Sequence, residues 1–218
     1  MNPADDKVML VNKPIEWTSF DVVNKLRNRL KVKKIGHAGT LDPLATGLLI
    51  LCTGKLTKQI DSFQQQEKEY TGIFTLGQTT PSHDLETEVS DPVSLAGITL
   101  EKLEACRKKF IGNIRQKPPQ HSAIRIEGKR AYEFARKGVE KELNAREVLV
   151  QEFDWHIELP NIQFRIVCSK GTYIRSLARD IGEELGVGAY LSSLCRTRIG
   201  NFKLSEAKTI EEILAEFK

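Results

Sequence analysis

Short apolar segments with strand-like patterns alternate along this chain with segments of helical periodicity. Residues 162–168 alternate apolar and polar side chains, which predicts a half-buried strand. Residues 7–11, 48–53 and 70–76 are short and largely apolar, and we predict strands there too. A chain that mixes strands and helices in this way is expected to fold into an α/β domain.

The helical segments carry recognisable start and stop signals. Thr18 and Asp21 have the spacing of a capping box and predict a helix that continues to residue 30. Further helices are expected over residues 99–112, over residues 128–138, and from Gly171 to a stop at Gly186. No internal repeat or clean linker divides the chain, so we predict one catalytic domain spanning residues 1–218.

Composition excludes several classes of protein. Of the 218 residues, 40% are hydrophobic and 28% are charged, as in ordinary globular proteins. The longest apolar runs are far too short to cross a bilayer, and the first ten residues lack the pattern of a secretory signal. We therefore expect a cytoplasmic protein, with a monomer as the default.

Cofactor and metal motifs are absent from the sequence. The histidines are scattered and the cysteines form no C-x-x-C pair, so neither a zinc site nor a disulfide framework is predicted. The segment "TGKLTK" resembles part of a phosphate loop, but Leu56 stands where Ser or Thr would bind magnesium. We expect no metal and no nucleotide cofactor.

Positive charge is concentrated in three places although the net charge is only +4. The basic groups span residues 25–34, 107–117 and 129–137. One such group usually just solvates a helix face, but three on a modestly charged chain favour a polyanionic partner such as RNA or DNA.

A single acid, Asp42, lies within the segment "GHAGTLDPLATG" of residues 36–47. Taken alone, an Asp followed by Pro43 predicts a helix start, with Asp42 as the N-cap. The alternative is that the carboxylate is there for chemistry, and the rest of the chain favours this second interpretation.

Several segments, in one order, resemble the TruB-type tRNA pseudouridine synthases. The signature block is "KIGHAGTLDPLATGLLILCTGKLTK", followed by "KEYTGIFTLGQTT", "QKPPQHSAIRIEGKRAYEFARKG", "VCSKGTYIRSLARDIGEELG" and "LCRTRIGNF". The resemblance covers residues 7–210. It implies the pseudouridine synthase fold, with a central mixed, largely antiparallel sheet flanked by helices, and isomerisation of uridine 55 in the T loop of tRNA to pseudouridine.

The resemblance also assigns the catalytic residues. Asp42 corresponds to the nucleophile, and a carboxylate is already ionised at neutral pH and needs no base to activate it. Arg175 corresponds to an arginine that keeps this aspartate ionised. Tyr70 corresponds to a tyrosine that stacks on the flipped uracil and assists removal of the proton from carbon five; without the resemblance, the sequence favours an aromatic side chain packed in the core of a strand.

Further residues are implied to bind the substrate. His37 matches a histidine that enters the T loop beside the displaced nucleotide, and Lys58 matches a lysine suited to a phosphate contact. The remaining matches are to pocket residues: Asp84, Tyr173 and Leu194. Asp84 falls in residues 79–97, the segment we expect to be the least regular, and which we expect RNA to order.

The sequence departs from the family pattern in places. Many relatives continue into a C-terminal RNA-binding domain of the PUA kind, which we do not expect here, because the chain stops at Lys218. Ala38 stands where relatives often have Thr. Two other function classes stay open: a non-catalytic RNA-binding module or tRNA folding assistant, and a glycosidase, although the motif lacks the second acid that a glycosidase needs.

Overall fold

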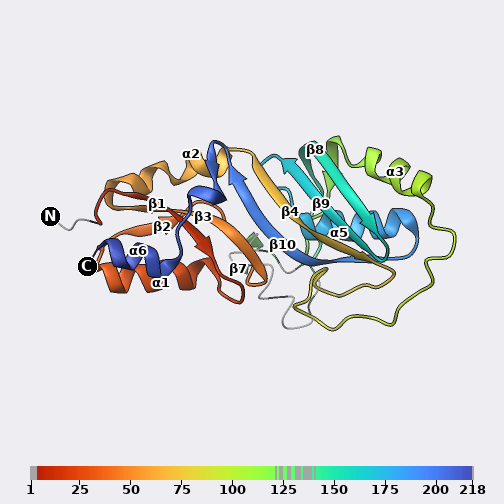
Figure 1. Ribbon diagram of the computed structural model, residues 1–218, viewed down its shortest axis with the longest axis horizontal. Coiled ribbons are helices and arrows are strands. Elements are labelled where there is room, and N and C mark those ends of the chain that lie inside the picture. The colour runs from red at the N-terminus through yellow and green to blue at the C-terminus, as the bar shows by residue number, and fades with distance from the viewer. Residues whose placement is uncertain are drawn as a thin grey trace. The chain divides into compact units, whose positions relative to one another are not determined.

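The computed structural model describes residues 4–120, 122, 125–126, 129–130, 134, 139 and 141–217 (Figure 1). The chain forms two compact units, Met1–Thr71 with Leu194–Lys218, and Gly72–Ser193. Two strands, β4 (Lys68–Leu76) and β10 (Ala189–Ile199), contribute residues to both units. Within the described part of the chain, no helix is long and apolar enough to cross a membrane.

The sheet of the first unit is built around β3 (Ala45–Thr53), eight of whose nine residues are buried. On one side β3 pairs antiparallel with β1 (Val8–Lys13), and on the other it pairs parallel with β10. Two short strands complete the unit: β2 (Ile35–His37) lies antiparallel to β3, and β11 (Phe202–Lys203) lies antiparallel to β10.

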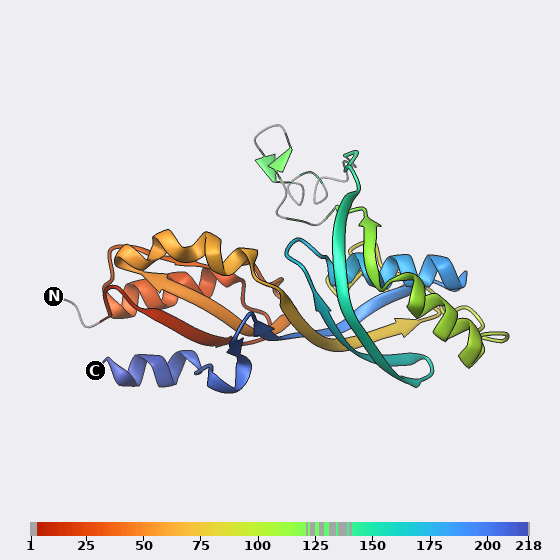
Figure 2. The same ribbon diagram turned by 90° about the horizontal axis from the view of Figure 1, so that it is seen from above.

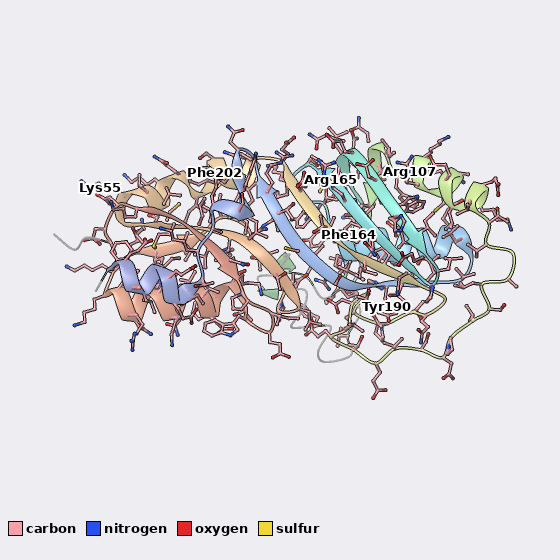
Figure 3. All side chains as sticks on the ribbon, viewed as in Figure 1. Lys55, Arg107, Phe164, Arg165, Tyr190 and Phe202 are labelled. Atoms are coloured by element: carbon pink, nitrogen blue, oxygen red, sulfur yellow. The ribbon has the colours of Figure 1, made fainter. Side chains whose placement is uncertain are left out.

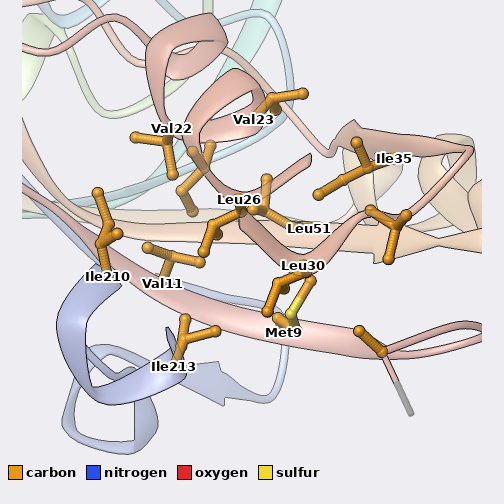
Figure 4. Packing of buried hydrophobic residues seen from close by; sticks show 13 residues of the cluster. Met9, Val11, Val22, Val23, Leu26, Leu30, Ile35, Leu51, Ile210 and Ile213 are labelled. Atoms are coloured by element: carbon orange, nitrogen blue, oxygen red, sulfur yellow. The ribbon is translucent and has the colours of Figure 1, made fainter. Parts of the chain in front are cut away.

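Each face of this sheet has its own hydrophobic core because side chains alternate along β1 and β3. One face packs against α1 (Ser19–Leu30) and α6 (Ile210–Glu216), as Figure 4 shows. The other face packs against α2 (Ile60–Gln65), the 3-10 helix η1 (Gly54–Gln59) and a second 3-10 turn, η2 (Leu204–Glu206). The predicted capping box of α1 is confirmed: the Thr18 and Asp21 side chains each accept a backbone N–H of the other residue.

The second unit has the strand order β4, β9 (Asn161–Cys168), β8 (Arg146–Glu158), β5 (Gly112–Gln116). The long β8–β9 hairpin is strongly curved, as Figure 2 shows. On its buried face, Phe164 of β9 stacks on Phe74 of β4, with ring centroids 4.1 Å apart. Two helices that contact each other, α3 (Leu100–Lys109) and α5 (Ile174–Leu185), and a small pair, β6 (Arg125–Ile126) with β7 (Lys129–Arg130), complete the unit.

The fold class is confirmed: helices flank a mixed sheet whose described pairings are mostly antiparallel. Strands lie at the four predicted places, and α5 ends at Gly186 as predicted. The interpretation of Asp42 as a helix start is wrong, because a turn and then β3 follow it. The helix predicted over residues 128–138, and with it the third basic group, lies outside the residues described in full.

Candidate active site

Asp42 lies in the loop that connects β2 to β3. Its carbonyl accepts the N–H of Ala45 at 3.1 Å, which closes a four-residue turn with Pro43 in the second position. This position suits the fixed backbone angle of proline, so the Asp-Pro pair builds a turn here rather than a helix. Leu194 on β10 pairs with Ala45, and His37 ends β2 opposite Leu51, so the fold attaches both residues to the Asp42 loop or its flanking strands.

The start of α1 holds the Asp42 loop in place. The Ser19 hydroxyl is buried, accepts the N–H of Leu41 at 2.8 Å and lies 3.2 Å from the carbonyl of the same residue. The N–H of Glu16 donates to the carbonyl of Pro43 at 2.9 Å. The residues on both sides of Asp42 are therefore fixed to the β1–α1 connection by hydrogen bonds.

Lys13, at the end of β1, is fully buried beneath this connection. Its ammonium donates to three backbone carbonyls: Pro14 at 2.8 Å, Trp17 at 2.6 Å and Pro43 at 3.2 Å. Burial lowers the pKa of Lys13 from 10.5 to about 8; the Asp42 carboxylate raises it, and the nearby Arg196 guanidinium lowers it. Lys13 therefore interacts electrostatically with the carboxylate of Asp42.

Arg196, on β10, is a second buried cation that contacts this loop, with 1% of its surface exposed. Its Nε donates to the carbonyl of Leu48 at 2.8 Å and its Nη2 to that of Gly39 at 3.1 Å. Gly47 has φ +101°, and a Cβ there would lie 2.4 Å from the Arg196 carbonyl oxygen. Glycine is thus required at position 47 both by its backbone angle and by the close approach of β10.

Sequence reasoning missed Lys13 and Arg196 as parts of this site. The available signal was a cation at the end of an apolar strand, in "KVMLVNK", and another two residues after Leu194. Lysine and arginine side chains are rarely fully buried unless partners compensate their charge. A lysine or arginine in or beside a buried strand could therefore have been singled out as a candidate site residue.

Two other predicted residues of the first unit lie on β4 and on η1. Tyr70 lies in β4 and is half-buried, so the strand predicted around it is confirmed. Lys58 is exposed on η1, where its side chain makes no hydrogen bond or ion pair with a described residue. Its role near the site stays a prediction.

In the second unit, Arg175 and Asp84 form a buried ion pair. Arg175 Nε lies 3.5 Å from Asp84 Oδ2, and Nη1 of the arginine donates to the carbonyl of Ser82 at 3.2 Å. Arg175 is in the first turn of α5, where the helix dipole disfavours a cation, and Asp84 is the acid that compensates this.

The turn around Asp84 is held by its own hydrogen bonds. The hydroxyls of Thr80 and Ser82 donate to the Asp84 carbonyl at 2.6 and 3.1 Å, and Asp84 Oδ1 accepts the N–H of Glu86 at 2.9 Å. Residues 77–99 contain no helix or strand, as predicted, but these bonds fix Asp84 beside the guanidinium.

Tyr173, the residue before α5, is held by a side chain that the sequence did not indicate. Gln116, at the end of β5, is 2% exposed; its Oε1 accepts the N–H of Tyr173 at 2.7 Å and its Nε2 donates to the Tyr173 carbonyl at 3.1 Å. A further hydrogen bond links the same two chain segments, because the Ser176 hydroxyl donates to the carbonyl of Lys117 at 2.8 Å. The end of β5 thus fixes the start of the helix that carries Arg175.

The predicted pair of Asp42 and Arg175 draws its members from different units. Asp42 belongs to the first and Arg175 to the second. Their pairing stays a prediction that experiment must test.

Two family models match the chain. Residues 27–174 match the TruB family pseudouridylate synthase N-terminal domain, and residues 175–218 match the tRNA pseudouridylate synthase B C-terminal domain. The chain is 54% identical to tRNA pseudouridine synthase B of Parabacteroides distasonis over 95% of its own length and 91% of the relative. It is 51% identical to the protein of the same name from Phocaeicola vulgatus, over 97% and 93%.

Solved structures share the fold. A chain in the crystal structure of a Cbf5-Nop10-Gar1 complex is 32% identical with a TM-score of 0.74, over 95% of this chain and 53% of that one. A chain in an H/ACA RNP bound to a substrate RNA containing 2′-deoxyuridine is 27% identical with a TM-score of 0.71, over 99% and 59%. This protein thus spans between half and three fifths of those chains. Its matches to both family models and its identity to full-length relatives show that it belongs to the TruB family of pseudouridylate synthases.

Proposed function

We propose that this protein converts uridine 55 in the T loop of tRNA to pseudouridine, with Asp42 as the nucleophile. The reaction breaks the N-glycosidic bond, turns the uracil over and rejoins it to the sugar through carbon five; carbon five loses its proton and the freed ring nitrogen gains one, so the composition of the nucleoside is unchanged. Support comes from the family membership and from relatives named tRNA pseudouridine synthase B.

The observation that carries this proposal is the support given to the Asp42 loop. Two buried cations, Lys13 and Arg196, bind backbone carbonyls of this loop and its flanks, and Asp42 interacts electrostatically with Lys13. A loop that served only as a connection would not need two buried charges, each of which is costly to desolvate. Fixed cations also favour the ionised carboxylate, which is the form that attacks.

The other site residues keep their predicted roles as parts of the proposal. Tyr70 stacks on the flipped base and assists transfer of the proton from carbon five, and Arg175 favours the ionised form of Asp42. Asp84 is assigned a positioning role, because it holds the guanidinium of Arg175. The substrate-binding set completes the proposal: His37, Lys58, Tyr173 and Leu194.

tRNA is the proposed partner, bound by a monomer in the cytoplasm, and the two units are proposed to form one catalytic domain. No cofactor enters the proposed reaction, because an internal rearrangement needs no external electron or group donor. The Asp42 carboxylate supplies the covalent chemistry, and the protein supplies the energy of about a few kcal/mol needed to unstack the uridine.

The test is mass mapping of pseudouridine in an unmodified tRNA transcript incubated with the purified protein. We expect one new pseudouridine, at position 55, and none when that uridine is replaced by cytidine. Tight tRNA binding without any pseudouridine would support the alternative of a non-catalytic RNA-binding protein or folding assistant. Pseudouridine only at other positions would overturn the assignment of the substrate.

A further inference from the structure

The segment leading to Asp42 is strongly and exclusively basic. Residues 22–41 contain no Asp or Glu but six cations: Lys25, Arg27, Arg29, Lys31, Lys33 and Lys34. A helix face that is only solvated commonly pairs acids with bases three or four residues apart, and this segment offers no such partner. The nearest acid, Asp21, lies four residues before Lys25 and already accepts bonds from Thr18, so within residues 22–41 the positive charge has no acidic counterpart.

The fold turns much of this charge to solvent. The apolar side of α1, with Val22, Leu26 and Leu30, faces the hydrophobic core that α1 shares with α6, as Figure 4 shows. The opposite side of the helix is exposed, and the basic segment continues beyond it. The exposed polar and basic residues of this region include Asn24, Lys25, Asn28, Arg29, Lys33 and Lys34.

Most of these cations have no acidic partner among the described residues, whereas several cations elsewhere do. Lys25, Arg29, Lys33 and Lys34 make no side-chain hydrogen bond or ion pair with any described residue. By contrast, the cations labelled in Figure 3 have acidic partners at 4.0, 2.6 and 2.6 Å: Lys55 with Asp6, Arg107 with Glu104, Arg165 with Glu152. The exposed face of α1 and the residues after it therefore present four cations without acidic partners among the described residues.

This face also carries a shallow, open depression. A cavity of about 420 Å³ is lined by Glu16, Trp17, Asp21, Asn24, Lys25, Asn28 and Arg29. Its two acids lie at the start of the helix, where Asp21 already accepts bonds from Thr18. The other end offers two amides and two cations, the side chains that most often contact nucleic-acid backbones.

We propose that the exposed face of α1 binds the phosphate backbone of the RNA stem next to the loop that carries the target uridine. This inference rests on the proposed function. Ser19, the first residue of α1, contacts Leu41 beside Asp42. Arg29 is ten residues further on, which is about 15 Å along a helix axis. That distance is too long for the reacting nucleotide and suits the neighbouring stem.

The test is the salt dependence of tRNA binding by Lys25→Gln/Arg29→Gln, compared with the wild type. Each lost phosphate contact lowers the slope of log K against log salt by about 0.9, so we expect the slope to fall by about 2 and Kd to rise about tenfold near 0.1 M salt. The matched control is Lys208→Gln/Arg165→Gln, which removes the same charge from residues that already pair with acids and lie outside the three basic groups. The control should change the slope far less.

A second arm identifies the part of the RNA that is contacted. Neutral methylphosphonate linkages in the stem should weaken binding by the wild type but weaken binding by the α1 variant no further, because the same contact is already lost. An unchanged slope in the α1 variant, or an equal change in the control, would overturn the proposal.

The readout also separates this inference from the proposed function. Because α1 is not assigned to catalysis, the variant should isomerise at the wild-type rate when RNA is saturating. A wild type that binds tRNA but makes no pseudouridine would overturn the proposed function and leave the binding face in place. A variant that isomerises normally with an unchanged salt slope would overturn the binding face and leave the proposed function in place.

Discussion

Arg175 Nε lies 3.5 Å from Asp84 Oδ2, and the two side chains are 4% and 7% exposed. The residues are distant in sequence. The family resemblance implies a different partner for Arg175, namely Asp42. A buried guanidinium needs a compensating acid wherever it is used. Asp84 fulfils that need within the second unit, so it is a structural requirement for Arg175 as well as a candidate pocket residue.

The first prediction concerns this ion pair. Asp84→Asn removes the charge opposite a buried arginine, and we expect it to lower the free energy of unfolding by about 3 kcal/mol. Urea denaturation measures the change. The control is Asp154→Asn, because Asp154 is exposed although it lies 3.2 Å from Arg165, and its loss should cost less than about 1 kcal/mol. Equal losses in the two variants would refute a special role for the buried pair.

The second prediction concerns Gln116 as a positioning residue. Gln116→Glu replaces the N–H donor facing the Tyr173 carbonyl with an oxygen, so the start of α5 should shift. We expect kcat to fall about tenfold or more while KM for tRNA stays within about threefold, since a small displacement at a reacting centre is costly. Steady-state kinetics on a tRNA transcript measure both values. Gln163→Glu, at an exposed position of β9, is the control, and a loss of similar size there would contradict the assignment.

The third prediction concerns the close approach of β10 to Gly47. Gly47→Ala adds a Cβ that would lie 2.4 Å from the Arg196 carbonyl oxygen, whereas Gly112→Ala, at a similar positive φ, meets nothing within 4 Å. In both variants an alanine at a positive φ is strained by about 1–2 kcal/mol, but only Gly47→Ala also has to displace a strand. Thermal unfolding should therefore show the larger loss for Gly47→Ala, accompanied by lower activity. A Gly47→Ala protein as stable as Gly112→Ala would contradict the predicted clash.

The fourth prediction follows from the lowered pKa of Lys13. Between about pH 8 and 10.5 the folded protein holds this proton less than the unfolded chain does. The unfolded state then binds more protons, so the contribution of Lys13 to stability rises with pH across this window. We expect the free energy of unfolding of the wild type, relative to Lys13→Met, to increase from pH 8 to pH 10.

The control for this prediction is Lys108→Met, because Lys108 is an exposed lysine on the surface of α3. Its difference from the wild type should not rise with pH. A wild-type advantage over Lys13→Met that falls with pH would mean that the ammonium is favoured in the folded state, contrary to the burial that lowers its pKa. At pH 7 we also expect Lys13→Met to be less stable than the wild type, since three carbonyls lose a donor.

Local patterns in the sequence predicted the local structure well. The capping box of Thr18 and Asp21, the alternating strand at residues 161–168 and the stop at Gly186 depend on neighbours along the chain, and the structure confirms each. Asp42 and Pro43 show the limit of such patterns. The same pair suits a helix start or a turn, and the strand pairing of Ala45 with Leu194 selects the turn.

The groups that hold the candidate site depend on distant contacts and were not predicted from the residues alone. In the sequence, Lys13 resembles an ordinary surface lysine. Only in the fold does its ammonium donate to the carbonyls of Pro14, Trp17 and Pro43. Gln116 likewise gains its role only when β5 meets the start of α5. The family resemblance named the reacting residues but not the residues that position them.

The central claim is that the carboxylate of Asp42 performs the chemistry. The most direct measurement is tritium release from a tRNA transcript labelled at carbon five of its uridines, catalysed by the wild type and by Asp42→Asn. We predict that the variant loses activity by about a thousandfold or more, because it lacks the nucleophile, while its Kd for tRNA changes by less than about threefold. Tritium release by Asp42→Asn at the wild-type rate would contradict the account.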